Sequence, residues 1–415
     1  MTDLVLRDAR ISGASGLVDI EADDGLIRSI LPAMGRTAET VIDCAGRVVI
    51  PGLIESHLHL DKALLDGEQA SQDGTLDGAI AVTGELKRAF TPATVRDRAM
   101  RVLDQAIING TTFVRAHPDV DPIVGLMTLD VMLGLREEYR GLLDLQVVAF
   151  PQEGLLRAPQ TLELLREGLR RGADVVGGCP YNEDSPADSR RHVDEVFALA
   201  AEFGAPADLH ADFADDASDP RFALAEYIAD VTVREGMGGR VALGHMTSLA
   251  GRPPAERKDV LARLAAAKVA VVPLPATDLH LSGRSDEQNV RRGIAPVREL
   301  WEAGVTTAYS SNNVRNAFTP YGNTDLLDIG LLLAQTCHLS GADDLARVLD
   351  MATGQAARVV GIADRYGLRP GAVADLVVLG TREVGDVLLD RPDRCYVIKG
   401  GRVVARTTRT TELRK

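Results

Sequence analysis

Two histidines separated by a single residue stand in the segment from Gly52 to Asp61. This segment is expected to form a β-strand, and residues two apart on a strand point to the same side, so His57 and His59 share one face. Imidazole is the commonest metal ligand and suits zinc or iron. The pair therefore predicts either a site for one divalent metal ion or a polar strand face.

Polar residues recur where the other predicted strands end. In a barrel of parallel strands, catalytic groups gather at the C-terminal strand ends, so this distribution predicts one site built from many segments. Of the eight histidines in the sequence, His192 and His338 fall instead in helical patterns and are expected to be packing or surface residues. The polar strand ends carry His57 and His59, His117, Gln152 and Glu153, Tyr181 and Asn182, His210 and Asp212, His245, Asp278 and His280, and Ser311 to Asn313.

The middle of the chain alternates between strand and helix patterns. After the strand at His57, apolar runs occur at residues 112–117, 143–150, 175–179, 207–210, 240–245, 269–273 and 305–310. Helical patterns separate them, for example at residues 96–109, 161–171, 193–203, 221–234, 257–267 and 297–303. Eight such units predict an α/β protein with a (β/α)8 TIM barrel. An open doubly wound sheet is the alternative, and the lack of a Gly-x-Gly-x-x-Gly motif after any strand disfavours it.

Short strand patterns broken by turns occupy both ends of the chain. Asp24-Gly25 and Gly46 are turn signals among the first fifty residues, and the last fifty contain two further apolar strand patterns. We therefore predict a small β-sandwich built from both chain termini, residues 1–50 and 366–415. The barrel is then expected over residues 51–365.

Composition excludes several classes of partner. The chain has 415 residues with 46 basic and 60 acidic side chains, a net charge of −14, which argues against binding of nucleic acid. Four scattered cysteines favour reduced thiols and a cytoplasmic protein. The first residues are charged and no long apolar run follows, so neither a signal peptide nor a membrane span is expected.

The motifs as a set resemble the amidohydrolase superfamily, and within it the cytosine deaminase branch that includes N-isopropylammelide amidohydrolase. The resemblance covers nearly the whole chain. It is carried by His57-Leu-His59-Leu-Asp61, Val114-Arg-Ala-His117, Ala149-Phe-Pro-Gln-Glu-Gly154, Leu209-His210-Ala-Asp212, Gly244-His245 and Leu279-His280-Leu-Ser-Gly-Arg284.

The resemblance implies roles for particular residues. It implies that His57, His59 and His210 hold one divalent metal ion, Zn²⁺ or Fe²⁺, that His245 orients the attacking hydroxide, and that Gln152 contacts a ring amide of the substrate. Three neutral imidazoles and an open position lower the pKa of bound water toward ~7. The expected reaction is cleavage of a C–N bond in a small nitrogen heterocycle or cyclic amide. A homo-oligomer is expected because relatives commonly assemble.

Two positions depart from the family pattern. Phe213 stands where relatives have a proton-carrying glutamate, and Asn312 stands where they have a metal-binding aspartate. Asparagine offers a neutral oxygen and cannot act as a base. Three interpretations stay open: a hydrolase in which Asp212, Asp278 or Glu153 carries the proton, a hydrolase with weakly bound metal or none, and a barrel that binds a heterocycle without hydrolysing it.

The remaining strand-end residues receive provisional roles. Arg115 is expected to pair with a carboxylate inside the barrel. For His117 and Phe213, packing is as well supported as a place in the substrate pocket. For Asn312 and Asn313, the alternatives are weak metal ligation and a polar wall that hydrogen-bonds the substrate. The residues assigned to catalysis are His245, Asp212 and Asn312. The residues assigned to substrate binding are Gln152, His117, Phe213, Tyr181, Asn313 and His280.

Overall fold

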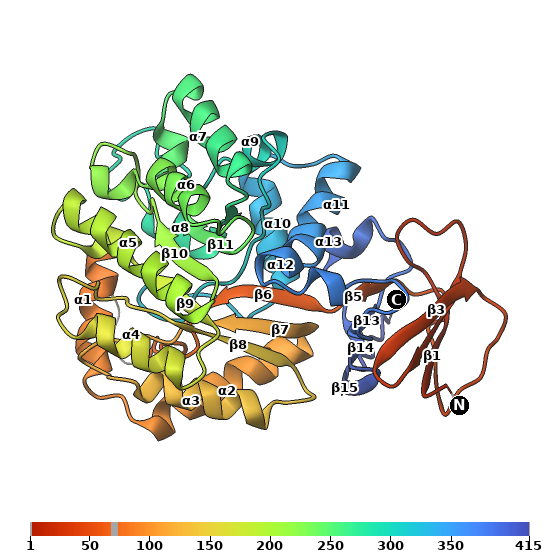
Figure 1. Ribbon diagram of the computed structural model, residues 1–415. Helices are drawn as coiled ribbons and strands as arrows, with labels where there is room; N and C mark the ends of the chain where they lie inside the picture. The colour runs from red at the N-terminus through yellow and green to blue at the C-terminus, as the bar shows by residue number, and fades with distance from the viewer. Residues whose placement is uncertain (1, 68–73, 415) are drawn as a thin grey trace.

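A computed structural model describes residues 2–67 and 74–414, and Figure 1 shows a barrel on the left with a β-sandwich on the right. Seven parallel strands lie in the order β12-β11-β10-β9-β8-β7-β6. Residues 307–312 complete the ring, because Thr307 bridges Val271 and Asn312 bridges Leu58. The predicted (β/α)8 barrel is confirmed. The strands are β6 (Leu53–Leu58), β7 (Thr111–Ala116), β8 (Asp144–Ala149), β9 (Val175–Gly178), β10 (Ala207–Ala211), β11 (Val241–His245) and β12 (Ala270–Val272).

A buried carboxylate fastens the closing segment to β6. Glu55 accepts hydrogen bonds from the Ser310 hydroxyl, from the Ser311 backbone N–H at 3.0 Å and from the Ser311 hydroxyl at 2.5 Å. The His59 N–H also donates to the Asn312 carbonyl oxygen at 2.8 Å, and the Asn312 N–H donates to that of His57 at 3.1 Å. This register places Asn312 beside His57 and His59 at the C-terminal end of β6.

Helices cover the outside of the barrel, as Figure 1 shows, and an apolar layer that includes Val114, Val147 and Leu209 lies beneath them. The fifth helix begins at Pro186, earlier than the predicted residue 193, because Ser185 caps it by accepting the Asp188 N–H at 3.2 Å. The helices are α1 (Leu76–Lys87), α2 (Pro92–Ile108), α3 (Met127–Glu138), α4 (Thr161–Arg170), α5 (Pro186–Phe203), α6 (Ala225–Arg234), α7 (Pro254–Ala266), α8 (Pro275–Leu281), α9 (Val297–Glu302), α10 (Leu326–Thr336), α11 (Ala342–Met351), α12 (Gly354–Val359) and α13 (Asp386–Asp390).

The two chain ends form the β-sandwich, as predicted. One sheet has the order β3-β2-β1-β4 and the other the order β15-β14-β13-β5, and side chains such as Leu6, Ile20 and Val378 pack between them. The boundaries at residues 50 and 365 stay a prediction. Among the described residues, no helix combines the length and apolar character needed to cross a membrane. The strands are β1 (Leu4–Ala9), β2 (Val18–Asp23), β3 (Leu26–Pro32), β4 (Thr40–Asp43), β5 (Val49–Pro51), β13 (Leu376–Leu379), β14 (Arg394–Lys399) and β15 (Arg402–Arg406).

His192 of α5 is a buried packing residue with a partner on each ring nitrogen. Its Nδ1–H donates to Glu183 at 2.7 Å, and its Nε2 accepts the Cys179 backbone N–H at 3.0 Å. Burial lowers the pKa of His192 below its usual 6.5, although Glu183 acts in the opposite direction. A second ring proton would face the Cys179 N–H, so the fold favours the neutral imidazole.

This arrangement predicts a pH-dependent contribution to stability. The unfolded state binds a proton at His192 below about pH 6.5, whereas the folded state resists it, so the stabilisation is full above that pH and is lost as the pH falls. The difference in unfolding free energy between wild type and His192→Gln should shrink by up to about 1.4 kcal/mol per pH unit below pH 6.5. Urea unfolding between pH 7.5 and 5 measures it, and a constant difference would contradict the assignment.

Candidate active site

Imidazole nitrogens from two strands converge at the C-terminal end of the barrel. His57 Nε2 lies 2.7 Å from His210 Nε2. The His59 Nδ1–H donates to the carbonyl oxygen of His117 at 2.8 Å, which turns its Nε2 toward the other two rings. One nitrogen from each of His57, His59 and His210 lies within 4.8 Å of the others. The three histidines assigned to metal binding are therefore brought together.

The surroundings keep these imidazoles neutral. Burial lowers the pKa of His57 to about 3 and the pKa values of His59 and His210 well below their usual 6.5. A neutral imidazole has the lone pair that a metal ion needs. The electrostatics of the cluster thus suit ligation.

Asp208 lies beneath the cluster and contacts His57, His117 and Arg115. Its Oδ1 is 3.5 Å from His57 Nδ1 and 3.3 Å from His117 Nε2, while its Oδ2 accepts from Arg115 at 2.8 Å. Burial raises the pKa of Asp208, but the His117 and His57 imidazoles outweigh this effect and hold the pKa well below its usual 3.8. The predicted pairing of Arg115 with a carboxylate is confirmed, and the ring of His117 stacks on His57 with centroids 3.7 Å apart.

Removing Asp208 should destabilise the fold strongly. Asp208→Ala leaves the buried guanidinium of Arg115 without its counterion, so the free energy of unfolding is expected to fall by about 3–5 kcal/mol. Glu138→Ala is the matched control, because it removes an exposed partner of Arg96 and should cost less than about 1 kcal/mol. Denaturant unfolding compares the two variants, and equal losses would refute the assignment.

His245 is held by a carboxylate on its far side. Its Nδ1–H donates to Asp278 Oδ1 at 2.6 Å, and Asp278 Oδ2 accepts the Leu274 backbone N–H at 2.9 Å. Burial raises the pKa of Asp278, while the imidazole of His245 opposes that rise. Phe213 stacks on the His245 ring with centroids 3.8 Å apart and planes 8° apart. His245 therefore has a fixed orientation at the cavity.

Several residues at these strand ends have left-handed backbone conformations. The φ angles are 50° at Asp212, 73° at His245, 59° at Met246 and 61° at Asn312. Such strain is uncommon outside glycine and clusters at functional sites. Asn312 also has a buried Oδ1 atom that finds no hydrogen-bond partner among the described residues.

The side chains enclose a narrow cavity of about 10 Å³, which is room for about one water molecule. A ring-shaped ligand therefore enters only when lining side chains such as Leu76 or Phe318 shift. The lining residues are His59, Lys62, Leu76, Gln152, Tyr181, His210, Phe213, His245, Thr277, Asn312, Asn313 and Phe318.

Four residues assigned from the sequence lie outside this lining, and one of them is the metal-ligand candidate His57, whose Nε2 contacts that of His210. The Asp212 carboxylate, whose pKa burial raises to about 6, accepts the Leu224 N–H at 2.7 Å and the Ala225 N–H at 3.2 Å. His117 lies behind the metal-ligand candidates, and His280 packs edge-on against Tyr321 in a separate pocket. Their roles in catalysis or substrate binding stay predictions.

Sequence reasoning missed Lys62, which lines the cavity and is 1% exposed. Its ammonium donates to Asp119 at 2.7 Å and to Gln152 Oε1 at 3.1 Å. Its position three residues after His59, at the end of the same strand, is the signal that could have found it.

Lys87 joins α1 to the strand ends behind Lys62. It forms ion pairs with Asp119 at 3.0 Å, Asp121 at 2.7 Å and Glu153 at 2.6 Å. Burial works to lower the pKa of Lys87, but these carboxylates outweigh it and raise that pKa. Glu153, one of the proton carriers considered above, is therefore engaged by Lys87.

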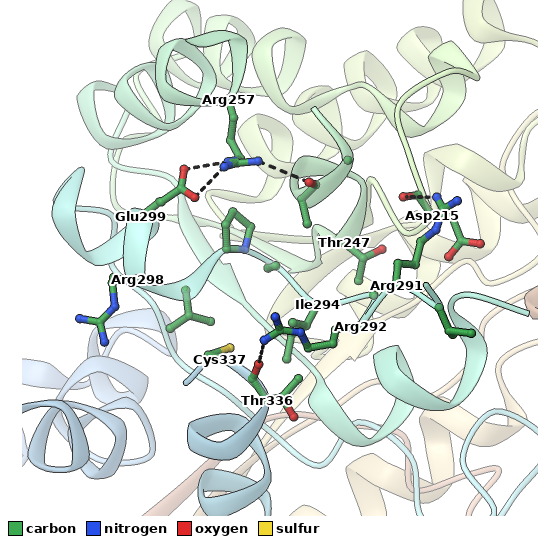
Figure 2. Close-up of a pocket in the computed structure, with 17 residues that line it drawn as sticks. Asp215, Thr247, Arg257, Arg291, Arg292, Ile294, Arg298, Glu299, Thr336 and Cys337 are labelled. Atoms are coloured by element: carbon green, nitrogen blue, oxygen red, sulfur yellow. Dashed lines mark hydrogen bonds and ion pairs between the residues drawn. The ribbon is translucent and has the colours of Figure 1, made fainter. Parts of the chain in front are cut away.

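A larger pocket of about 690 Å³, shown in Figure 2, lies among residues of α7, α9 and α10. Arg257 binds both carboxylate oxygens of Glu299 at 2.7 and 2.8 Å, and Arg292 donates to the Thr336 carbonyl oxygen at 2.6 Å. Two further arginines are bound by acidic side chains, Arg291 by Asp286 and Arg298 by Asp344. The charged side chains that line this pocket thus serve mainly to hold its loops together.

The (β/α)8 barrel brings together at its C-terminal end histidines that could hold a metal ion, an arrangement suited to a hydrolase. Residues 40–405 match the model of the amidohydrolase family, and the chain belongs to that family. The predictions of the superfamily and of a hydrolase acting on non-peptide C–N bonds are thereby confirmed.

Particular relatives support the predicted branch. The chain is 28% identical over 414 residues to N-isopropylammelide isopropyl amidohydrolase of Pseudomonas sp. (strain ADP), covering 97% of each chain. It is 30% identical over 394 residues to pterin deaminase of Rhizobium rhizogenes, covering 94% of this chain and 88% of the relative. The crystal structure of 5-methylcytosine deaminase from Klebsiella pneumoniae liganded with 5-fluorocytosine superposes with a TM-score of 0.93 at 30% identity over 99% of both chains.

Proposed function

We propose that this enzyme hydrolyses the bond between a ring carbon and an amino or alkylamino group of a small nitrogen heterocycle. The observation that carries the proposal is the convergence of three buried neutral imidazoles with a carboxylate-bound fourth, His245, at one cavity. The relatives named as amidohydrolases and deaminases of ammelide, pterin and cytosine derivatives support this chemistry.

The residues present fit a divalent metal ion. His57, His59 and His210 would hold it through neutral nitrogens, and the unpartnered Oδ1 of Asn312 is a further neutral donor beside them. Zn²⁺ and Fe²⁺ both suit imidazole ligands. When bound, such an ion supplies Lewis-acid activation of a water molecule.

We assign proton transfer to His245. It would take a proton from the attacking water, whose oxygen bonds to the ring carbon, and pass it to the departing nitrogen as the C–N bond breaks. The products are the oxo-heterocycle and ammonia or an amine. Asp278 is a positioning residue in this scheme, because it contacts His245 while Asp212 and Glu153 are bound elsewhere. The proposal keeps the active hydrolase of the first interpretation above, but with His245 as the proton carrier in place of a carboxylate.

The experiment that tests the function combines metal analysis with a substrate screen. Purified protein, as isolated and after loading with Zn²⁺ or Fe²⁺, should contain about one equivalent of metal. The loaded protein should release ammonia or an amine from at least one member of a panel of amino- and alkylamino-substituted pyrimidines, triazines and pterins. Absence of metal under every loading condition would overturn the proposal.

The alternative function, a barrel that binds a heterocycle without hydrolysing it, is favoured by the loss of both family carboxylates at Phe213 and Asn312. Metal content with ligand binding and no turnover across the panel would support it. The cytoplasmic location and the homo-oligomeric state stay predictions.

A further inference from the structure

We propose that Lys62 binds the substrate directly and that the site selects heterocycles with a negatively charged oxo group, such as an ionised cyclic imide. This inference rests on the proposed function and names the substrate class for it. It starts from the one buried ammonium group at the cavity among the described residues.

The ammonium of Lys62 is held firmly but not saturated. It bonds with Asp119 and Gln152, so two of its three N–H donors have acceptors among the described residues. The rings of Phe150 and Phe318 flank it, with centroids 5.7 and 5.4 Å from Nζ. Removing an ammonium from water is costly, so a lysine held beside a cavity is suited to recognising an anion there.

The amide of Gln152 serves this arrangement. Its Oε1 accepts from Lys62, and its Nε2 lies 3.7 Å from the Cys179 sulfur. Both ends of the amide therefore have protein partners. In this proposal Gln152 positions the Lys62 ammonium, and its assignment to substrate binding stays a prediction.

The charge of the cavity wall also favours an anionic ligand. No carboxylate belongs to the described residues that line it, because Asp119 is turned to Lys62 and Lys87, and Asp278 is turned to His245. Asn313 accepts from Asn316 through Oδ1 at 2.8 Å, which leaves its amide N–H groups as donors. A wall with one cation and several donors complements an anionic oxygen and disfavours a cationic ring.

The test compares two ligands of the same ring size. Barbiturate is an anion at neutral pH and uracil is neutral, and calorimetry on the Zn²⁺-loaded protein measures the affinity of each. Lys62→Met should weaken barbiturate binding by about tenfold to 100-fold, the range expected for a charged hydrogen bond, and change uracil binding less than about threefold. Lys62→Arg should restore much of the barbiturate affinity. Lys258→Met, at an exposed position on α7, should change neither.

Equal losses for the two ligands, unchanged barbiturate binding in Lys62→Met, or no barbiturate binding to the wild type would overturn the proposal. If the methionine variant does not fold, Lys62→Gln keeps a hydrogen-bond donor without the charge and should show the same selective loss. The result is separable from the proposed function because binding is measured without turnover. Amine release with no ligand selectivity would defeat only this inference, and selective binding without amine release would defeat only the function.

Discussion

Replacing His210 with alanine is expected to abolish metal binding and to lower turnover by on the order of 10³-fold or more. His210 supplies one of three converging nitrogens, and the fourth nearby donor is the neutral amide of Asn312. A neutral amide is a weaker ligand than a carboxylate, so it is not expected to hold the ion when one imidazole is removed. Elemental analysis of the purified variant, followed by assays of amine release, measures both effects.

The matched control is His338→Ala. His338 is an exposed imidazole that accepts from Arg292 at 3.1 Å and lies outside the cluster. It should retain wild-type metal content and turnover. If His210→Ala kept about one equivalent of metal and its activity, the three-histidine site would be wrong.

The second large effect is expected at Asp278. Asp278→Asn should lower kcat by about 10²- to 10⁴-fold with little change in KM. A carboxamide presents an N–H donor as well as an acceptor oxygen, so it does not fix the Nδ1–H tautomer of His245 as a carboxylate does. A merely structural role would not move the pH profile of kcat. Asp278→Asn is expected to shift one limb of the pH profile of kcat and to retain the wild-type metal content.

Asp212→Asn distinguishes the two candidate carboxylates. Asp212 accepts the first N–H groups of α6 and does not line the cavity, so its variant should lower the melting temperature while kcat stays within about tenfold of wild type. The reverse ranking, with Asp212→Asn inactive and Asp278→Asn active, would make Asp212 the proton carrier.

The architecture was open to prediction because it depends on local patterns. Apolar strands alternating with amphipathic helices, and strand-rich ends, are readable within short windows, and barrels place functional groups at strand ends by topology. These rules were enough to bring His57, His59, His210, His245 and Gln152 together.

What the sequence could not decide is which way each polar side chain turns once it reaches a strand end. Asp212 turns to the N–H groups of α6, Glu153 turns to Lys87, and Lys62 turns into the cavity. Each orientation depends on a partner that tertiary packing brings near. Lys87 and Glu153, for example, are 66 residues apart in the sequence. Burial makes an unpaired charge costly, so the partners available in the folded chain, and not the residue types, determine which carboxylates and amines remain for chemistry.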